Sequence, residues 1–249
     1  MIRKIAFILA MILILSLCGC TGLSAPPDEE TVSPSMEPTA TETPVVTPEP
    51  TPAATPSAAE SADGLAGRFE GEQYINEALG LSVTIPQEWM FATAEEIETL
   101  YGQAQNLLEG VTELPANSQG ILMVCSQYQL QTASANPNIN LMVTNMYGAL
   151  SKSLYDSLLP QFQSMYETMY TQQLGAESVE VTGEPSVTIN GQDYMFFSIV
   201  TQFDNGTAMY QEQYFLPGDG YAVTFTLTYY QPEEKATMEA FMQGITIMP

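Results

Sequence analysis

The chain has 249 residues and a formal net charge of -24 at pH 7, with 29 acidic side chains against five basic ones and no histidine. Nucleic-acid binding and direct docking on anionic lipid headgroups both depend on clustered lysine and arginine, so this composition excludes the first and argues against the second. Without histidine, the usual serine and cysteine hydrolase triads cannot be built, and the commonest metal ligand is missing.

A charged and then apolar leader opens the chain. Arg3 and Lys4 precede an unbroken apolar run from Ile5 to Leu15, which is the layout of a secretory signal. A membrane-spanning helix needs about 20 apolar residues, and this run is shorter. We therefore predict a signal peptide that is removed.

A short cysteine-containing stretch, Leu17-Cys18-Gly19-Cys20, follows the leader. It resembles the lipobox of bacterial lipoproteins, in which an aliphatic residue, a tolerant position and a small residue precede an obligatory cysteine. The resemblance implies cleavage between Gly19 and Cys20 and attachment of a diacylglycerol to the Cys20 thiol. Two or more acyl chains hold a protein stably on a membrane, so the chain is expected on the outer side of a bacterial cell membrane. An ordinary secreted protein with a chance cysteine is the alternative.

The next segment is rich in proline, threonine, alanine, serine and glutamate, from Ser24 to about Asp63. Nothing in it can form a core, and its prolines favour extended geometry, so we predict a disordered but semi-stiff spacer. Roughly 40 residues at about 3.1 Å each would reach on the order of 120 Å. The same composition fits an O-glycosylated stalk. The predicted organisation is a signal peptide over 1–19, the lipidated cysteine and linker over 20–64, and one globular domain over 65–249.

The first hairpin of the domain is predicted within residues 74–89. Leu81, Val83 and Ile85 alternate with polar residues, which is typical of a strand with one buried face. Pro86 ends that strand because it has no N–H to donate.

Several residues of this hairpin together resemble the start of PsbP-like domains. They are Tyr74, Asn76, the Gly80-Leu81 pair that opens the strand, and Pro86 followed by Trp89. PsbP-like domains are named for an extrinsic protein of photosystem II and also occur in many bacterial lipoproteins. The resemblance implies an α+β fold with an antiparallel β-sheet flanked by helices, an α/β/α sandwich. It also implies a binding or assembly role without catalysis.

A helix is predicted to begin at Thr93 and to end near Gly110. Thr93 followed by Glu96 forms a capping box. Glu95, Glu96 and Glu98 could hold a metal, but acids in a first turn are explained by the helix dipole, and we favour that interpretation. Apolar residues then recur at helical spacing: Ile97, Leu100, Tyr101, Ala104, Leu107 and Leu108.

Two strands follow, over Ile121 to Tyr128 and Asn140 to Tyr147, joined by a polar stretch. Cys125 lies in the first of them and is the one thiol left once Cys18 is removed and Cys20 is lipidated. No intramolecular disulfide is then possible, so the domain must rest on its hydrophobic core. We predict that Cys125 is a small buried residue.

A second helical region runs from Ser151 towards Gly175, and Pro160 inside it predicts a kink or two helices. Its apolar stripe consists of Leu154, Leu158, Phe162, Met165 and Met169, and beside it lie Tyr155, Leu159, Tyr166 and Tyr170. We favour core packing over a ligand groove for these side chains. Whether the stripe of Tyr155, Tyr166 and Tyr170 is core or binding surface stays open.

The remainder predicts an antiparallel meander with one covered face. Asn190-Gly191 is a tight-turn signal. Pro232 and Gly244 bound a short final helix, and Ile245 to Ile247 is a candidate edge strand. The predicted strands are Val179 to Thr182, Ser186 to Ile189, Tyr194 to Phe203, Ala208 to Leu216 and Tyr221 to Tyr230.

Cys20 is the one functional position that the sequence predicts, with no catalytic, metal or cofactor-binding residue. The leading hypothesis is a lipid-anchored binding or accessory domain whose partner, beyond the membrane, is an unknown protein or small molecule. One alternative is a carboxylate-dependent glycan hydrolase, which requires two carboxylates about 5–10 Å apart. The other is a cation-binding surface protein, because an acidic surface attracts cations, although the acidity could simply keep an exported domain soluble.

Overall fold

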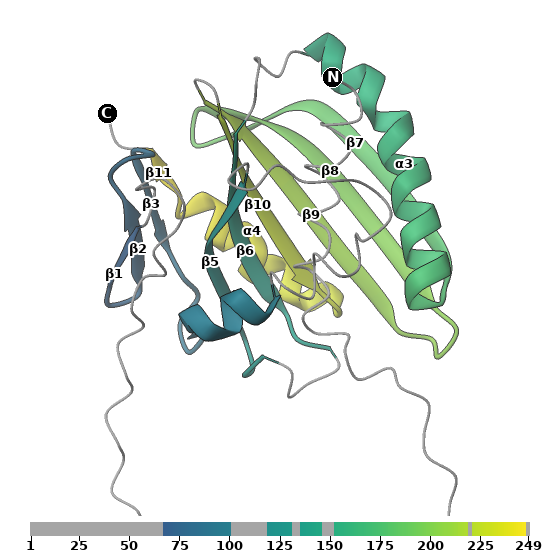
Figure 1. Cartoon of the computed structure of the whole chain (residues 1–249), viewed down its shortest axis with the longest axis horizontal. Coiled ribbons are helices and arrows are strands. Elements are labelled where there is room, and N and C mark those ends of the chain that lie inside the picture. Colours follow the sequence, from purple (N-terminus) through teal and green to yellow (C-terminus); the bar gives the residue numbers. More distant parts are fainter. Residues whose placement is uncertain (1–66, 101–118, 131–134, 146–151, 219–220, 248–249) are drawn as a thin grey trace, which may run out of the picture.

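The computed structural model describes residues 67–100, 119–130, 135–145, 152–218 and 221–247 (Figure 1). Cys20, the predicted signal peptide and the predicted linker lie outside the described residues. So does the predicted helix beyond residue 100.

The described strands form two antiparallel sheets. One has seven strands in the order β4-β5-β6-β10-β9-β8-β7, and the other has four in the order β1-β2-β3-β11. The strands of the larger sheet are β4 (Met90–Phe91), β5 (Gln119–Ser126), β6 (Asn138–Asn145), β7 (Ala176–Ile189), β8 (Gln192–Phe203), β9 (Ala208–Pro217) and β10 (Tyr221–Tyr229). Those of the smaller sheet are β1 (Arg68–Glu70), β2 (Gln73–Asn76), β3 (Leu81–Thr84) and β11 (Thr246–Ile247).

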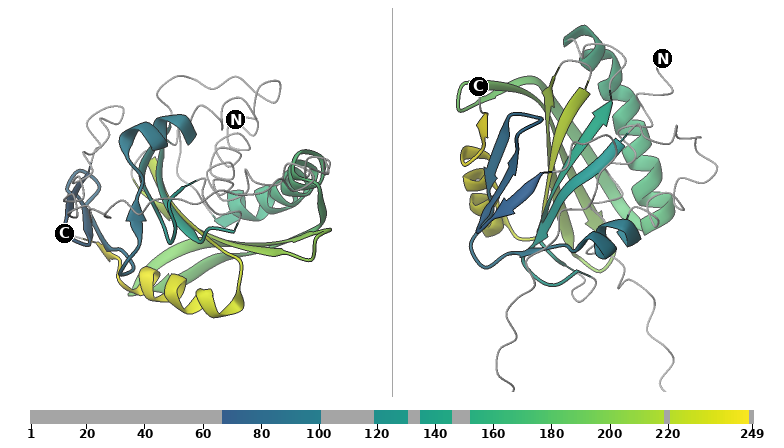
Figure 2. Two further views of the ribbon diagram at one scale, coloured as in Figure 1. Left: turned by 90° about the horizontal axis from the view of Figure 1, so that it is seen from below. Right: turned by 60° about the vertical axis from the view of Figure 1, so that its left-hand side comes forward.

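Helices cover both faces of the seven-stranded sheet. Helix α3 (Lys152–Leu174) lies on one face, and α4 (Lys235–Gln243), preceded by the 3-10 turn η3 (Pro232–Glu234), lies on the other (Figure 2). Residues 94–100 form a further helical segment. The expected α+β class, an antiparallel sheet flanked by helices, is thereby confirmed. No helix in the described part of the chain is both long and apolar enough to cross a membrane.

The hydrophobic core has one part on each face of the large sheet. Under α3, Phe162 packs edge-on against Phe197 with ring centroids 4.9 Å apart. On the other face, Phe241 of α4 packs against Phe225 of β10, and Val83 of the small sheet joins the same cluster. The small sheet and α4 therefore share one core layer.

Several predicted features are confirmed at the level of residues. Asn190 and Gly191 both have positive φ, 52° and 77°, as a two-residue hairpin turn requires. The final helix ends at Gly244, and β11 returns to pair with β3 through Thr246 opposite Ser82.

The capping box at Thr93 is also confirmed. The Thr93 N–H donates to Glu96 Oε2 at 2.7 Å, and the Glu96 N–H donates to Thr93 Oγ1 at 3.2 Å. This geometry supports capping as the role of Glu96. Within the described residues no group of three or more His, Cys, Asp and Glu could hold a metal ion.

Two local predictions are wrong. Of the kink or two helices predicted around Pro160, the two-helix alternative is wrong, because a single helix runs through Pro160. Proline in a helix interior costs about 3 kcal/mol or more, but apolar packing of the turns after Pro160 against the sheet offsets this cost. The two short strands predicted on either side of Pro185 are the single strand β7, with an irregular register between Glu184 and Val187. Because β7 is an edge strand, a proline and a bulge are tolerated there.

The expectation of one covered sheet face is wrong as well. Along β10, Val223, Phe225 and Leu227 face α4, and the intervening threonines face α3, but every residue from 222 to 230 is buried. Antiparallel sheets commonly leave a polar face in water, whereas this sheet buries its polar face. The candidate functional site lies there.

Candidate functional site: a buried polar band

A band of uncharged polar side chains crosses the centre of the seven-stranded sheet on the face covered by α3. Each of these side chains is 1% exposed or less. We call this set the polar band: Asn138, Asn140 and Thr144 on β6, Thr201 on β8, Gln211 and Gln213 on β9, and Thr224, Thr226 and Thr228 on β10.

Strand register sets these side chains side by side. Residues directly opposite each other on antiparallel strands have Cβ atoms about 5 Å apart, so opposed side chains on one face are neighbours. The register produces two polar rows across β9, β10 and β6: one of Gln211, Thr228 and Asn138, the other of Gln213, Thr226 and Asn140. These two rows form a continuous polar strip across the three strands.

Two tyrosines of α3 cover the band. The Tyr166 hydroxyl donates to Gln213 Oε1 at 2.8 Å, and the Tyr170 hydroxyl donates to Gln211 Oε1. Both tyrosines are 0% exposed, and their rings stack at 6.2 Å. Burial raises the pKa of Tyr166, so its hydroxyl stays a protonated donor. Tyr166 and Tyr170 are thus core residues, as we favoured, although their hydroxyls meet polar partners. The side chain of Tyr155 lies outside the described part.

Some band members hydrogen-bond to one another. Gln211 Nε2 donates to Thr228 Oγ1 at 3.3 Å, and Asn140 Nδ2 donates to Asn138 Oδ1 at 3.1 Å. Asn138 Nδ2 donates in turn to the Asn136 carbonyl at 2.9 Å. These bonds fix the orientation of both asparagine amides and of Gln211.

Five atoms of the band are buried without a hydrogen-bond partner in the described structure: Asn140 Oδ1, Thr144 Oγ1, Thr201 Oγ1, Gln213 Nε2 and Thr224 Oγ1. Buried polar atoms are nearly always paired, and each unpaired one costs about 1–3 kcal/mol. All five lie on the same face of the sheet, and they include both donors and acceptors. This concentration of unpaired polar atoms on one covered face distinguishes the polar band from the rest of the core.

The polar band carries no side chain that could act as nucleophile, general acid or general base at neutral pH. It holds amides and hydroxyls, and the tyrosine above Gln213 is kept protonated by burial. What it can do chemically is donate and accept hydrogen bonds in a dry environment. The sequence signal for the band was the alternation of Thr224, Thr226 and Thr228 with apolar residues along β10.

A charged cluster lies on the opposite face, beneath α4. Glu212 is only 4% exposed, and its carboxylate accepts from the hydroxyls of Tyr214 at 2.8 Å and Tyr229 at 3.3 Å. Lys235 Nζ lies 3.3 Å from Glu212 Oε1 and 3.9 Å from Glu239 Oε1. Burial, followed by the Glu212 charge, raises the pKa of both tyrosines.

This cluster places two carboxylates near each other, but Lys235 stands within 4.0 Å of both. In a glycosidase a sugar or a water occupies the space between the two acids. Here the two carboxylates share one ammonium group, and the Lys235–Glu212 ion pair links α4 to β9. We therefore expect this cluster to stabilise the fold.

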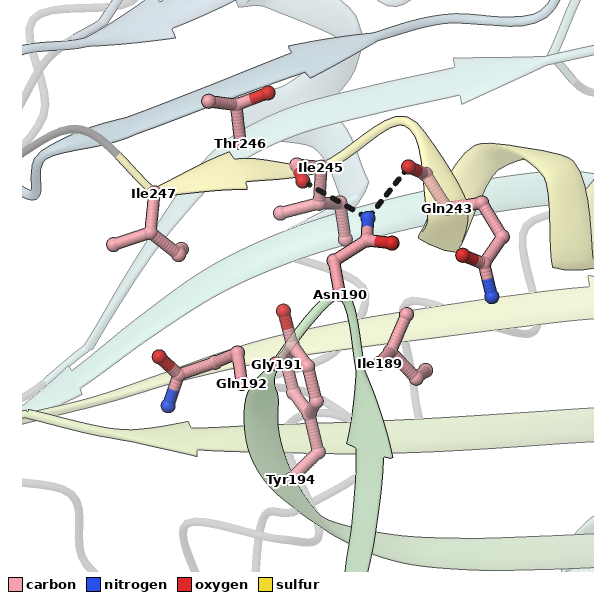
Figure 3. A pocket seen from close by; sticks show the side chains of 9 residues that line it. All are labelled: Ile189, Asn190, Gly191, Gln192, Tyr194, Gln243, Ile245, Thr246 and Ile247. Carbon is pink, nitrogen blue, oxygen red and sulfur yellow. Dashed lines mark hydrogen bonds between the residues drawn. The ribbon is translucent and has the colours of Figure 1, made fainter.

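A third feature is a pocket of about 380 Å³ between the β7–β8 hairpin tip and the segment that leads from α4 into β11 (Figure 3). Asn190 Nδ2 donates to the carbonyls of Gln243 at 2.6 Å and Ile245 at 3.4 Å. Burial raises the pKa of Tyr194, which also lines the pocket, to about 12. None of the described residues that line it is charged.

Cys125 behaves as the sequence predicts. It is 0% exposed on β5, and burial raises the pKa of its thiol. A buried, protonated thiol is inert.

Comparisons with known proteins concern the fold alone. No protein-family model matches the chain, and no curated protein matches its sequence. Among solved structures, cyanobacterial PsbP (CyanoP) from Synechocystis matches at 12% identity with a TM-score of 0.45, covering 73% of this chain and 98% of that one. LpqN, described as involved in cell envelope biogenesis of Mycobacterium tuberculosis, matches at 13% identity with a TM-score of 0.37, covering 68% of this chain and 83% of that one.

A third structure, from Bacteroides thetaiotaomicron, matches at 11% identity with a TM-score of 0.36, covering 73% of this chain and 50% of that one. A PsbP protein thus stands among the matched structures. Likeness at this level of identity and overlap establishes no function, so the functional argument rests on the residues.

Proposed function

We propose that this chain is a lipid-anchored extracytoplasmic accessory protein whose domain binds an uncharged, hydrogen-bonding ligand at the polar band. Cys20 carries the anchor, and residues 20–64 form the tether. The ligand class is a neutral molecule with both donors and acceptors, such as a saccharide or an amide. The observation that carries this proposal is the set of five unpaired polar atoms on one buried face.

The neutrality of the ligand follows from the neutrality of the band. A charged group brought onto this buried face would lose its hydration without meeting an opposite charge. Burying such a charge costs more free energy than burying a neutral polar group. The overall charge of -24 adds repulsion for anions. A neutral ligand can instead pair with Asn140 Oδ1 as a donor and with Gln213 Nε2 as an acceptor.

The proposal includes no catalysis. General acid–base chemistry needs a group whose pKa lies near the operating pH. The polar band consists of amides and aliphatic hydroxyls, and burial raises the pKa of Tyr166, which covers the band. The carboxylate hydrolase remains the enzymatic alternative, and Glu212 is the buried acid of the described residues on which it can be tested. Inhibition or labelling of Glu212 by a glycoside-derived electrophile would favour that alternative.

A thermal-shift panel tests the ligand class. The full-length chain, purified in detergent, is heated with neutral oligosaccharides, neutral capped peptides, their anionic and cationic analogues, and calcium. A ligand of the native state at 100 times its Kd stabilises by about 2.7 kcal/mol. We expect a saturable rise in Tm with one neutral class and no rise with its charged analogues. A rise with calcium alone would replace this proposal with the cation-binding alternative.

The anchor has its own test with a matched control. Palmitate labelling in a bacterial host is compared for Cys20→Ala and Cys18→Ala, since both cysteines lie in the lipobox-like stretch. We expect Cys20→Ala to lose the label and the membrane fraction, and Cys18→Ala to keep both. Label retained by Cys20→Ala would contradict the anchor.

A further inference from the structure

The pocket at the β7–β8 hairpin tip is bordered by main chain on both sides. Three consecutive residues, Ile245, Thr246 and Ile247, line one wall, and Ile189, Asn190, Gly191 and Gln192 line the other (Figure 3). Side chains in an extended segment alternate in direction. Consecutive residues can therefore all line one pocket only where their backbone itself borders it.

The wall formed by β11 is the free edge of a sheet. β11 pairs with β3 on one side and is the last strand of the four-stranded sheet. An edge strand presents N–H and C=O groups that another extended segment can pair with.

The Asn190 side chain shows which side of the chain at β11 can accept a further strand. Its Nδ2 donates to the Ile245 carbonyl, as the N–H of an added strand would. Residues two apart along a strand present their backbone groups to the same side of the ladder. Ile245 directly precedes β11. We infer that the N–H and C=O of Ile247, two residues further on, face the same side as the Ile245 carbonyl and offer the next positions for a ladder bond.

Tyr194 adds a second recognition group. It is 2% exposed, it lines the pocket, and its hydroxyl has no hydrogen-bond partner in the described part of the chain. Its ring is fixed by edge contacts with Tyr214 at 6.2 Å and Phe225 at 6.3 Å. A hydroxyl held in this way is positioned to bond a carbonyl or an N–H within the pocket.

We propose that this pocket binds a short, uncharged, extended peptide segment of a partner protein by strand addition to β11. The backbone of Ile247 supplies ladder hydrogen bonds, the Tyr194 hydroxyl bonds a peptide group, and Ile247, which is exposed, packs against an apolar side chain. Strand addition uses main-chain bonds for affinity and neighbouring side chains for specificity. The absence of charge in the lining selects against acidic and basic segments.

The site is separate from the polar band. The pocket belongs to the core layer of α4 and the small sheet, and the band lies on the opposite face of the large sheet. The peptide proposal goes beyond the proposed function, and either can fail without the other.

Fluorescence anisotropy with a labelled, capped Val-Thr hexapeptide tests the proposal on the full-length chain in detergent. The control probe is the same peptide N-methylated at alternate residues, which cannot form a ladder. Ile247→Pro removes the outward N–H while leaving the pairing of Thr246 with β3, and Ile247→Ala retains that N–H. Tyr194→Phe removes only a hydroxyl and serves as a second variant that should fold.

We expect saturable binding of the plain peptide, at least tenfold weaker binding by Ile247→Pro, and several-fold weaker binding by Tyr194→Phe. Ile247→Ala should stay within about threefold of the original chain, and Thr224→Val in the polar band should have no effect. Equal binding of the N-methylated probe, equal binding by Ile247→Pro and Tyr194→Phe, or no binding of the plain peptide would each overturn the proposal.

Discussion

Two threonines on one strand allow a paired test of the polar band. Thr224 and Thr228 both lie on β10, face α3 and are 1% and 0% exposed. Thr224 Oγ1 has no hydrogen-bond partner, whereas Thr228 Oγ1 accepts from Gln211 Nε2 at 3.3 Å. Replacing each by valine removes a hydroxyl and adds a methyl of similar shape at the same depth in the sheet.

The expected effects on the free energy of unfolding have opposite signs. Thr224→Val removes an unsatisfied hydroxyl that costs about 1–3 kcal/mol and adds apolar burial of about 0.8 kcal/mol, so stability should rise by roughly 2–4 kcal/mol. Thr228→Val leaves the Gln211 amide unpaired at a cost of about 1–3 kcal/mol, which outweighs the added methyl. Stability should fall by roughly 0.5–2 kcal/mol.

Urea titrations followed by tyrosine fluorescence and circular dichroism measure both changes. A domain of this size shifts its Tm by roughly 2–4 °C per kcal/mol, so thermal melts provide a second reading. Unchanged m-values would show that the changes in the free energy of unfolding do not come from an altered denatured state. If both variants stabilise, or both destabilise by the same amount, the distinction between paired and unpaired band members is incorrect.

Three further predictions concern the rest of the fold. Pro160→Ala should raise the free energy of unfolding by roughly 1–3 kcal/mol, because Pro160 is exposed inside α3 and its ring opposes helix geometry; a loss of stability in urea melts would contradict this. Lys235→Met should lower stability by roughly 1–2 kcal/mol, because it leaves the buried Glu212 carboxylate without its half-exposed ion-pair partner. Adding Glu212→Gln removes that unpaired charge and should recover part of the loss. Burial raises the pKa of Tyr194 to about 12. Its contribution to stability is therefore complete below the unfolded-state pKa near 10 and is lost as pH rises towards 12. Tyr194→Phe should make the loss of stability at alkaline pH smaller, and an unchanged pH profile would refute this.

Local patterns predicted most of the elements. The capping residues Thr93 and Glu96, the Asn190-Gly191 turn and the helix stop at Gly244 act through near neighbours in the sequence, and the structure confirms each. Features that depend on tertiary packing are harder to predict from the sequence. Pro160 breaks isolated helices, but the aromatic face that follows it is held against the sheet.

The polar band could not be predicted from the sequence because period-two alternation reports two faces and not what covers them. Thr224, Thr226 and Thr228 alternate with apolar residues as they would on a solvated sheet. Only the placement of α3, with Tyr166 above Gln213, shows that this polar face is buried. Glu212 was missed for the same reason, because an acid in a strand is ordinarily exposed.

The central claim is that the polar band binds an uncharged ligand through atoms that the chain itself leaves unpaired. The most direct test is the neutral-ligand thermal-shift panel on two chains side by side, the original and a triple variant with Thr144→Val, Thr201→Val and Thr224→Val, which replaces three unpaired hydroxyls. We predict that the triple variant melts at a higher temperature without ligand and shows no ligand-induced shift, while the original chain is stabilised by one neutral class. Equal shifts in the two chains, or a flat panel for both, would contradict the claim.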